Sequence, residues 1–396
     1  MDITISPRRL RGDLTVIPSK SQAHRLLICA AFSDKPTLLQ CAETNRDIEA
    51  TADCLTALGA KIIRTDSGYT VFPVKAVPEQ AELHCRESGS TLRFLLPVAG
   101  ALGVDALFTM EGRLPQRPLS PLWEEMERMG CTLTRPTSDT IRCTGKLRPG
   151  AYRIDGGISS QYITGLLLAL SLLGSGSQLE ITGKAESRPY IEMTKAAISL
   201  FGGDPDHPGE KRFHSPGAVS VEGDWSNGAF FLAANELGSH LNLRGLDPDS
   251  PQGDRAVLGI LPLLRSGAPR VSAADIPDLV PILSVAAASN HGAVFTDIRR
   301  LRMKESDRVA SVMAMLKSLG GRAEADDNTL TVFPSGFTGG VVDSFNDHRI
   351  AMSAAIAATV CTGPVTVLGA ECVSKSYPGF WEEYRRLGGN YEQHVR

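Results

Sequence analysis

The chain lacks several features that would place it in a special class of protein. Its longest strongly apolar stretch, residues 166–173, is far shorter than the roughly 20 residues that a membrane-spanning helix needs. The first four residues contain no basic segment leading into an apolar one, so we expect no secretory signal peptide. A formal net charge of −3 lacks the excess of Lys and Arg that a nucleic-acid surface requires. We therefore expect neither a membrane nor a nucleic-acid partner.

Cysteine and glycine patterns exclude further classes. None of the eight cysteines forms a Cys-x-x-Cys pair or has metal-ligand spacing. They fit small buried side chains in a reducing compartment, so we expect a cytoplasmic protein without a metal. Neither the Gly-x-x-x-x-Gly-Lys-Ser/Thr loop nor a Gly-x-Gly-x-x-Gly turn after a strand is present. This disfavours a nucleotide-dependent kinase, and we expect no cofactor.

The sequence does contain a globular composition and an internal repeat. Hydrophobic residues make up 42% and charged residues 21% of 396 residues, a length that favours two domains. An amphipathic helix that ends in Leu/Met-Gly and runs into a β-like segment recurs along the chain. The glycines of these copies are Gly59, Gly130, Gly202, Gly320 and Gly388, with a weaker copy at Gly267. Six copies at comparable spacing predict repeated units, each with a left-handed glycine after a helix.

Four further segments predict helices without a polar face: 163–173, 230–235, 279–288 and 350–360. Such helices belong inside a domain. We therefore expect an α/β fold of two lobes, each with three repeats, helices within and sheets outside. The predicted N-terminal lobe is 13–223, and the C-terminal lobe is 1–12 plus 224–396, so that the first strand crosses back.

Five polar turns stand at the start of predicted helices: 18–25, 87–93, 159–161, 346–349 and 374–378. Free N–H groups and the helix dipole make a helix start an anion site, although a single turn could be an ordinary N-cap. Ser21 and Arg25 share a helix face, and Pro378 suits a helix's first turn. Five turns enriched in Ser, Lys, Arg and Gln indicate small anionic substrates.

Other segments add candidate acid–base and phosphate-binding groups. Lys304 and Arg308, with Glu305 between them, form a cation pair beside a carboxylate if they lie on one helix; the alternative is a solvated charged face. Asp278 is either the N-cap of the following helix or a site carboxylate. Arg117 lies in a proline-rich loop that suits phosphate, or it is an ordinary surface arginine.

Taken in order, these segments resemble the enolpyruvyl transferase family over residues 17–384, and within it the branch whose acceptor is shikimate 3-phosphate. The matching pieces are 18–21 with Arg25, 88–93, 117–119, 159–161, 188–190, 276–278, 304–308, 346–349 and Lys375. The resemblance implies an inside-out α/β barrel of two lobes, each with three βαβαββ-type repeats around a cleft. It also implies a monomeric enzyme that acts on phosphoenolpyruvate and shikimate 3-phosphate.

The resemblance implies roles for individual residues. Those expected to hold shikimate 3-phosphate are Lys20, Ser21, Arg25, Ser159, Ser160, Gln161, Ser187, Asp278 and Lys304. Those expected to hold phosphoenolpyruvate are Lys20, Gly89, Arg117, Gln161, Arg308, Arg349 and Lys375. In an addition–elimination through a tetrahedral adduct, Asp278 would be the base on the ring 5-hydroxyl, Glu305 the acid and later base at C3, and Lys20 would assist both steps. Closure of the lobes would align the reactants and exclude water.

Three residues depart from the family pattern, and two alternatives stay open. Arg300 replaces a common Asn, Glu87 replaces a neutral residue, and Phe94 follows Arg93 where some members have Pro, so we make no prediction about sensitivity to glyphosate. The sibling branch that acts on UDP-N-acetylglucosamine normally has a cysteine shortly before the arginine that matches Arg117, and residues 111–116 have none. A non-catalytic phosphometabolite-binding protein could lose Asp278 or Glu305, and both are present.

Overall fold

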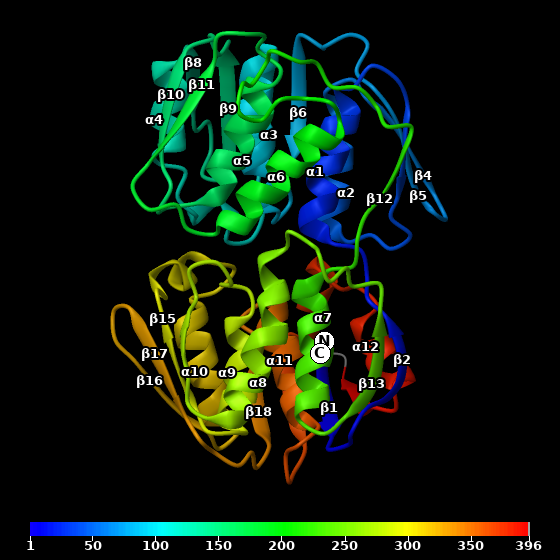
Figure 1. Ribbon diagram of the computed structural model, residues 1–396, viewed down its shortest axis with the longest axis vertical. Helices are drawn as coiled ribbons and strands as arrows, with labels where there is room; N and C mark the ends of the chain where they lie inside the picture. The colour runs from blue at the N-terminus through cyan, green and yellow to red at the C-terminus, as the bar shows by residue number, and fades with distance from the viewer. Residues whose placement is uncertain (395–396) are drawn as a thin grey trace. The chain divides into compact units, whose positions relative to one another are not determined.

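The computed structural model describes residues 1–394 and divides into two compact units (Figure 1). The N-terminal unit is Pro18–Glu222, and the C-terminal unit joins Met1–Ile17 to the chain from Gly223 onward. The expected boundary after residue 12 is therefore wrong, since residues 13–17 belong to the C-terminal unit. The reason is strand β2 (Arg11–Thr15), which pairs in parallel with β13 (His240–Arg244) along its whole length.

The sheets of the N-terminal unit repeat one pattern. Two four-stranded sheets have the orders β12-β3-β5-β4 and β6-β7-β9-β8, and a two-stranded sheet pairs β10 with β11. In each sheet the first two strands are parallel, and in the larger sheets an antiparallel pair follows. The strands are β3 (Thr37–Gln40), β4 (Lys61–Thr65), β5 (Gly68–Phe72), β6 (Gln80–His84), β7 (Asp105–Thr109), β8 (Cys131–Thr134), β9 (Thr140–Gly145), β10 (Ala151–Asp155), β11 (Gln178–Thr182) and β12 (Ala218–Ser220).

The C-terminal unit has the same pattern. Its four-stranded sheets are β14-β15-β17-β16 and β18-β19-β1-β20, and its two-stranded sheet is β13-β2. Strand β1 completes the last sheet by pairing antiparallel with both β19 and β20. The remaining strands are β1 (Asp2–Ser6), β14 (Arg270–Ser272), β15 (Ala293–Thr296), β16 (Arg322–Ala325), β17 (Thr329–Phe333), β18 (Gly340–Asp343), β19 (Val365–Leu368) and β20 (Asn390–His394).

Buried helices form the centre of each unit. These are α1 (Lys20–Ala31), α3 (Gly89–Leu102) and α5 (Ser160–Leu170) in one unit, and α7 (Trp225–Glu236), α9 (Val280–Ala288) and α11 (His348–Ala358) in the other. In Figure 1, α3 and α5 lie between strands β8–β11 on one side and β4, β5 and β12 on the other. Every residue of α9 and α11 is buried. The four helices expected to lack a polar face are thus all internal.

A second set of helices packs outside the central ones, and short 3-10 turns link the elements. The outer helices are α2 (Arg46–Ala57), α4 (Leu122–Arg128), α6 (Arg188–Leu200), α8 (Val257–Ser266), α10 (Arg308–Ser318) and α12 (Phe380–Arg386). The 3-10 turns are η1 (Leu114–Gln116), η2 (Gly253–Ala256), η3 (Arg299–Met303) and η4 (Ala370–Lys375). Within residues 1–394, each helix is too short or too polar to span a bilayer.

The glycines that mark the repeats end the outer helices as expected, with one exception. Five have positive φ angles, from 73° at Gly202 to 115° at Gly130. Gly267 has a φ of 175°, so it is extended rather than left-handed. The expectation at this weaker copy is wrong, because the chain leaves α8 directly in an extended conformation.

Candidate active site

Three of the five polar turns begin the central helices of the N-terminal unit. Ser19, Ser88 and Ser159 are the N-caps of α1, α3 and α5, and each side chain accepts a hydrogen bond from a backbone N–H of the first turn. The serine side chains leave other N–H groups of these turns available to an anion. The sequence predicted these three helix starts correctly.

Gln161 connects two of these helix starts. Its Nε2 donates to Ser90 Oγ at 3.1 Å, and its Oε1 accepts from Arg93 Nη1 at 3.1 Å. Gly89 lies against the same arginine, because a Cβ at this position would come within 2.6 Å of Arg93 Nη1 and 2.7 Å of Arg117 Nη1. The structure therefore brings together Gly89, Arg117 and Gln161, and it adds Arg93, which the sequence reasoning did not assign to the site.

Lys20 and Arg25 of α1 are both engaged by other side chains or backbone groups. Lys20 Nζ forms an ion pair with Asp47 Oδ2 of α2 at 3.0 Å. Arg25 is 2% exposed and donates to the backbone oxygens of Ser21 and Tyr190, at 2.6 and 2.9 Å. Burial lowers the pKa of Arg25 to about 10, still far above neutral pH, so the guanidinium stays charged.

Of the four serines expected to contact shikimate 3-phosphate, Ser21 lies in the first turn of α1, and the other three stand at the starts of α5 and α6. Ser159 and Ser160 stand at the start of α5, and Ser160 is buried. Ser187 is the N-cap residue of α6, has a left-handed φ of 56° and is buried. A non-glycine residue in this conformation is uncommon and often marks a functional position.

In the C-terminal unit the expected residues converge on two buried arginines. Arg308 has a fully buried side chain and contacts Asp278 Oδ1 at 2.5 Å, Glu305 Oε2 at 2.7 Å and Asp347 Oδ2 at 2.9 Å. Arg349 contacts the other oxygen of Asp278 at 2.8 Å. Buried cations require such carboxylate partners, because an unpaired charge in the interior is strongly unfavourable.

The charges of this cluster shift the pKa values of its members. Burial opposes ionisation of Asp278, but Arg349, Arg308 and Lys304 together outweigh it and hold the pKa of Asp278 well below its usual range. For Lys304, burial and the nearby arginines Arg300 and Arg308 lower the pKa to about 8, against the opposing effect of Asp278. Asp278 is thus a carboxylate at neutral pH, and Lys304 is close to its titration point.

Two expectations about local structure in this unit are corrected, and one of the two alternatives left open for Asp278 is excluded. Lys304 follows η3 in an extended conformation, and α10 begins only at Arg308, so the two cations do not share a helix. Asp278 is not an N-cap: Leu279 precedes α9, and no side chain caps that helix. Lys375 ends η4 rather than starting a helix, Pro378 lies before α12, and Lys375 Nζ donates to the backbone oxygen of Asn346 at 3.0 Å.

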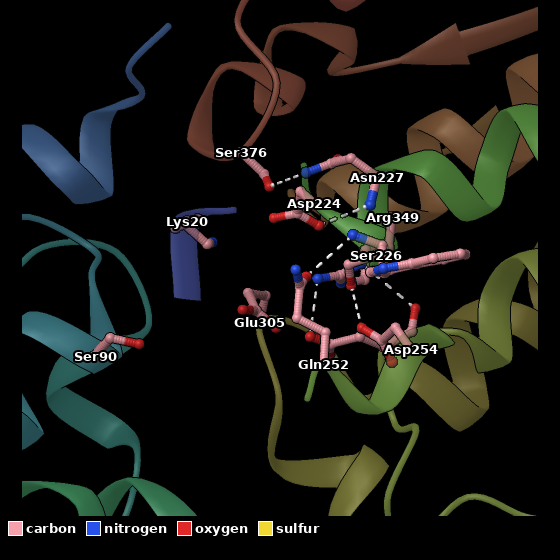
Figure 2. A network of polar contacts seen from close by, with 12 residues as sticks. Lys20, Ser90, Asp224, Ser226, Asn227, Gln252, Asp254, Glu305, Arg349 and Ser376 are labelled. Atoms are coloured by element: carbon pink, nitrogen blue, oxygen red, sulfur yellow. Dashed lines mark hydrogen bonds and ion pairs between the residues drawn. The ribbon is translucent and has the colours of Figure 1, made fainter. Parts of the chain in front are cut away.

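The sequence reasoning missed a polar cluster at the start of α7 (Figure 2). Asp224 caps the helix by accepting from Asn227 N at 2.9 Å, and Ser226 Oγ donates to Asp254 Oδ2 at 2.5 Å. Asp254 is 4% exposed. Burial and the nearby charge of Asp278 raise the pKa of Asp254 to about 7. A polar turn before an apolar helix, the design of the five turns above, also occurs at 224–227 and could have identified this cluster.

Comparison with known proteins identifies the family. The EPSP synthase (3-phosphoshikimate 1-carboxyvinyltransferase) family model matches residues 5–266 and 265–384. The chain belongs to the EPSP synthase family. It is 36% identical over 419 residues to the 3-phosphoshikimate 1-carboxyvinyltransferase of Clostridium kluyveri, covering 99% of this chain and 98% of that protein. The enzyme of the same name from Clostridium acetobutylicum is 35% identical over 420 residues, with the same coverage.

Solved structures of EPSP synthase family members and other enolpyruvyl transferases share the fold. EPSP synthase from Acinetobacter baumannii superimposes with a TM-score of 0.81 at 21% identity, covering all of both chains. The enolpyruvyl transferase NikO from Streptomyces tendae has a TM-score of 0.74 at 17% identity, covering 100% of this chain and 99% of that chain. The predicted α/β fold of two lobes is therefore confirmed.

Proposed function

We propose that the protein transfers the enolpyruvyl group of phosphoenolpyruvate to the 5-hydroxyl of shikimate 3-phosphate and releases phosphate. The observation that carries the proposal is the full-length match to relatives named 3-phosphoshikimate 1-carboxyvinyltransferase. The arrangement of charges supports it. Phosphoenolpyruvate carries a phosphate and a carboxylate, and both units present arginines beside polar helix starts.

We assign the same residues to each substrate as the family resemblance implies. Phosphoenolpyruvate would contact Lys20, Gly89, Arg117, Gln161, Arg308, Arg349 and Lys375. Shikimate 3-phosphate would contact Lys20, Ser21, Arg25, Ser159, Ser160, Gln161, Ser187, Asp278 and Lys304. Guanidinium groups suit phosphate and carboxylate because they donate two parallel hydrogen bonds, and hydroxyl and amide groups suit the ring hydroxyls.

In the proposed reaction the ring 5-hydroxyl attacks C2 of phosphoenolpyruvate while a proton reaches C3, and phosphate and a C3 proton then leave. Asp278 would accept the hydroxyl proton, Glu305 would supply and later remove the C3 proton, and Lys20 would assist both steps. Paired with Arg308 and Arg349, Asp278 is a weak base. Substrate anions that bind these arginines would raise the pKa of Asp278 and make it a stronger base.

The UDP-N-acetylglucosamine branch is the second candidate, and a binding protein without catalysis is the third. The lack of a cysteine in residues 111–116 and the names of the full-length relatives disfavour the second. The third would need no proton-transfer groups, whereas Asp278 and Glu305 both lie in the arginine cluster.

The test is phosphate release from purified protein with phosphoenolpyruvate and either shikimate 3-phosphate or UDP-N-acetylglucosamine. We expect release only with shikimate 3-phosphate, and its loss in Asp278→Asn and Glu305→Gln. Glu324→Gln is the matched control, because Glu324 forms an exposed pair with Arg322 in the same unit. Release with the nucleotide sugar alone would assign the sibling activity, and binding without release would exclude catalysis.

We also propose that the protein acts as a monomer in the cytoplasm. Its eight cysteines are all free thiols and all buried, as suits a reducing compartment. Light scattering during size-exclusion chromatography would test the monomer, for which 42.4 kDa is expected.

A further inference from the structure

A chain of buried hydrogen bonds joins the three helices α1, α2 and α3 in the N-terminal unit. His24 Nδ1 lies 2.7 Å from Thr51 Oγ1, and Thr51 Oγ1 lies 2.8 Å from Thr91 Oγ1. Thr91 Oγ1 donates to Ser88 Oγ at 2.7 Å. All four side chains are 0% exposed. The chain ends at the N-cap of α3, next to Gly89, and its members are absent from the roles proposed above.

The direction of one bond in this hydrogen-bond chain, from Thr91 Oγ1 to Ser88 Oγ, sets the tautomer of His24. The hydroxyl proton of Thr91 goes to Ser88 Oγ, or to the more distant backbone oxygen of Asp47 at 3.4 Å. In both cases Thr91 Oγ1 must accept from Thr51. Because the single proton of Thr51 is then used, its oxygen must accept from His24 Nδ1–H. Each hydrogen bond of this series is therefore donated in the same direction, from the His24 imidazole toward Ser88 at the helix cap.

The surroundings of the ring agree with a neutral imidazole whose Nε2 carries no proton. Burial, with Lys20 and Arg25 nearby, lowers the pKa of His24 well below its ordinary value. Nε2 has no hydrogen-bond partner within residues 1–394, and the ring stands edge-on to Phe94 at a centroid distance of 6.2 Å. Beside this ring, leaving the Nε2 lone pair without a hydrogen bond costs less free energy than leaving an N–H of a buried cation unpaired.

The hydrogen-bond chain ends at Ser88, in the helix start that is expected to bind phosphoenolpyruvate. Ser88 Oγ also accepts from the backbone N–H of Thr91 at 3.2 Å, which fixes the first turn of α3. In that turn the Gly89 backbone lies against Arg93 and Arg117. A displacement of this turn would therefore move the N–H groups and the arginine Arg117 relative to each other.

We propose that His24 is a positioning residue that, as the neutral Nδ1–H tautomer, holds the N-terminal turn of α3 in place through Thr51 and Thr91. In this role it orients the backbone at Gly89 toward an anion without touching the anion itself. That the anion is phosphoenolpyruvate rests on the proposed function. The tautomer and the hydrogen-bond chain do not.

The first test is the nitrogen spectrum of protein labelled with ¹⁵N-histidine, without substrates. The signals of His24 are those that disappear in His24→Asn. We expect a pyrrole-type Nδ1 and a pyridine-type Nε2 that persist from about pH 6 to 8, because the ordinary pKa of about 6.5 is lowered. A proton on Nε2 alone, or an ordinary titration in this range, would overturn the proposal.

The second test compares His24→Asn with His24→Leu, two side chains of similar size. Asn places an N–H at the position of Nδ1 and can donate to Thr51, whereas Leu cannot. We expect His24→Leu and Thr51→Val to raise KM for phosphoenolpyruvate about fivefold, the usual effect of one hydrogen bond, with kcat within about twofold. His24→Asn should stay within about twofold of the natural protein in both constants.

Thr37→Val is the control for stability, because it removes a buried hydroxyl pair, Thr37 to Ser215 at 2.7 Å, elsewhere in the same unit. It should leave both kinetic constants unchanged. Equal KM values for His24→Leu, Thr51→Val and the natural protein would refute the positioning role, as would a KM for His24→Asn as high as that of His24→Leu. If the natural protein released no phosphate, the proposed function would fail while the tautomer result stood alone.

Discussion

Replacement of Asp254 by asparagine should change how the stability of the C-terminal unit depends on pH. The carboxyl group is 4% exposed and is hydrogen-bonded to Ser226, and its pKa is raised to about 7 by burial and by Asp278. The ordinary value is 3.8. Between these two values the folded chain binds a proton that the unfolded chain has lost. Stability from this group is therefore fully present below about pH 4 and decreases as the pH rises through 7.

The size of the effect follows from the two pKa values. A single group with these values changes the free energy of unfolding by about 3 kcal/mol between pH 5 and pH 8, and by about 4 kcal/mol in total. An asparagine side chain cannot ionise, so the Asp254→Asn protein should lack this decrease. The quantity to compare is the slope of the free energy of unfolding against pH, because the amide also changes the absolute free energy of unfolding through the groups around it.

Urea unfolding at several pH values would measure the slope. Trp225 and Trp381 lie in the C-terminal unit and Trp123 in the other. In a Trp123→Phe background, fluorescence therefore reports the C-terminal unit alone, which avoids mixing two transitions. Asp327→Asn, in the exposed turn between β16 and β17, is the control and should keep the slope of the parent. If the free energy of unfolding changed with pH in the same way in Asp254→Asn and in its parent, Asp254 would already be ionised at pH 5, and the reasoning would be refuted.

Three further changes have defined outcomes. Gly89→Ala should raise KM for phosphoenolpyruvate at least about tenfold in the phosphate-release assay, because its Cβ would meet Arg93 and Arg117 at 2.6 and 2.7 Å; an unchanged KM would contradict the assigned contact. Arg308→Met should destabilise the C-terminal unit by about 3–5 kcal/mol in urea, since it leaves three carboxylates near a lost cation; a smaller loss would show that they become protonated or hydrated. Gly267→Ala should keep or slightly raise the thermal unfolding temperature, since its φ of 175° and open surroundings accept a side chain; clear destabilisation would contradict this.

The sequence predicted those parts of the fold that have a local signature. A glycine in a left-handed conformation after an amphipathic helix is such a signature, and it located five of the six repeats. The boundary of the units has none, because β2 belongs to the C-terminal unit only through pairing with β13, more than 200 residues away along the chain. A pairing between distant strands depends on the whole topology and cannot be read from either segment.

The same limit explains which central helices the sequence identified. α5 and α9 are apolar on all sides, and their burial follows from composition alone. α1 and α3 are equally internal, but they carry His24, Arg25, Thr91 and Arg93, each of which hydrogen-bonds to a side chain of another helix. Those partners appear only in the folded chain, so α1 and α3 could be predicted as helices but not as internal ones.

For the candidate site, predictions were correct where a regular helix sets the spacing and wrong where it does not. The turns at 18–25, 87–93 and 159–161 begin helices as expected. Lys304 follows the 3-10 turn η3, so the i to i+4 rule fails for Lys304 and Arg308, and Lys375 ends the 3-10 turn η4 instead of starting a helix. Asp254 was missed for a related reason, since it lies in the short turn η2 and meets Ser226 only through the fold.

The arrangement around Arg308 has a consequence for the proposed reaction. Without substrates, Asp278 forms ion pairs with both Arg308 and Arg349, so an incoming anion gains less than it would from free guanidinium groups. The same pairing keeps Asp278 a weak base until that anion arrives. If phosphoenolpyruvate binds these arginines as proposed, it would withdraw positive charge from Asp278 and add negative charge nearby, and both effects would raise the pKa of the carboxyl group. In the proposed function, binding affinity is thus reduced in exchange for a base that becomes effective when both reactants are present.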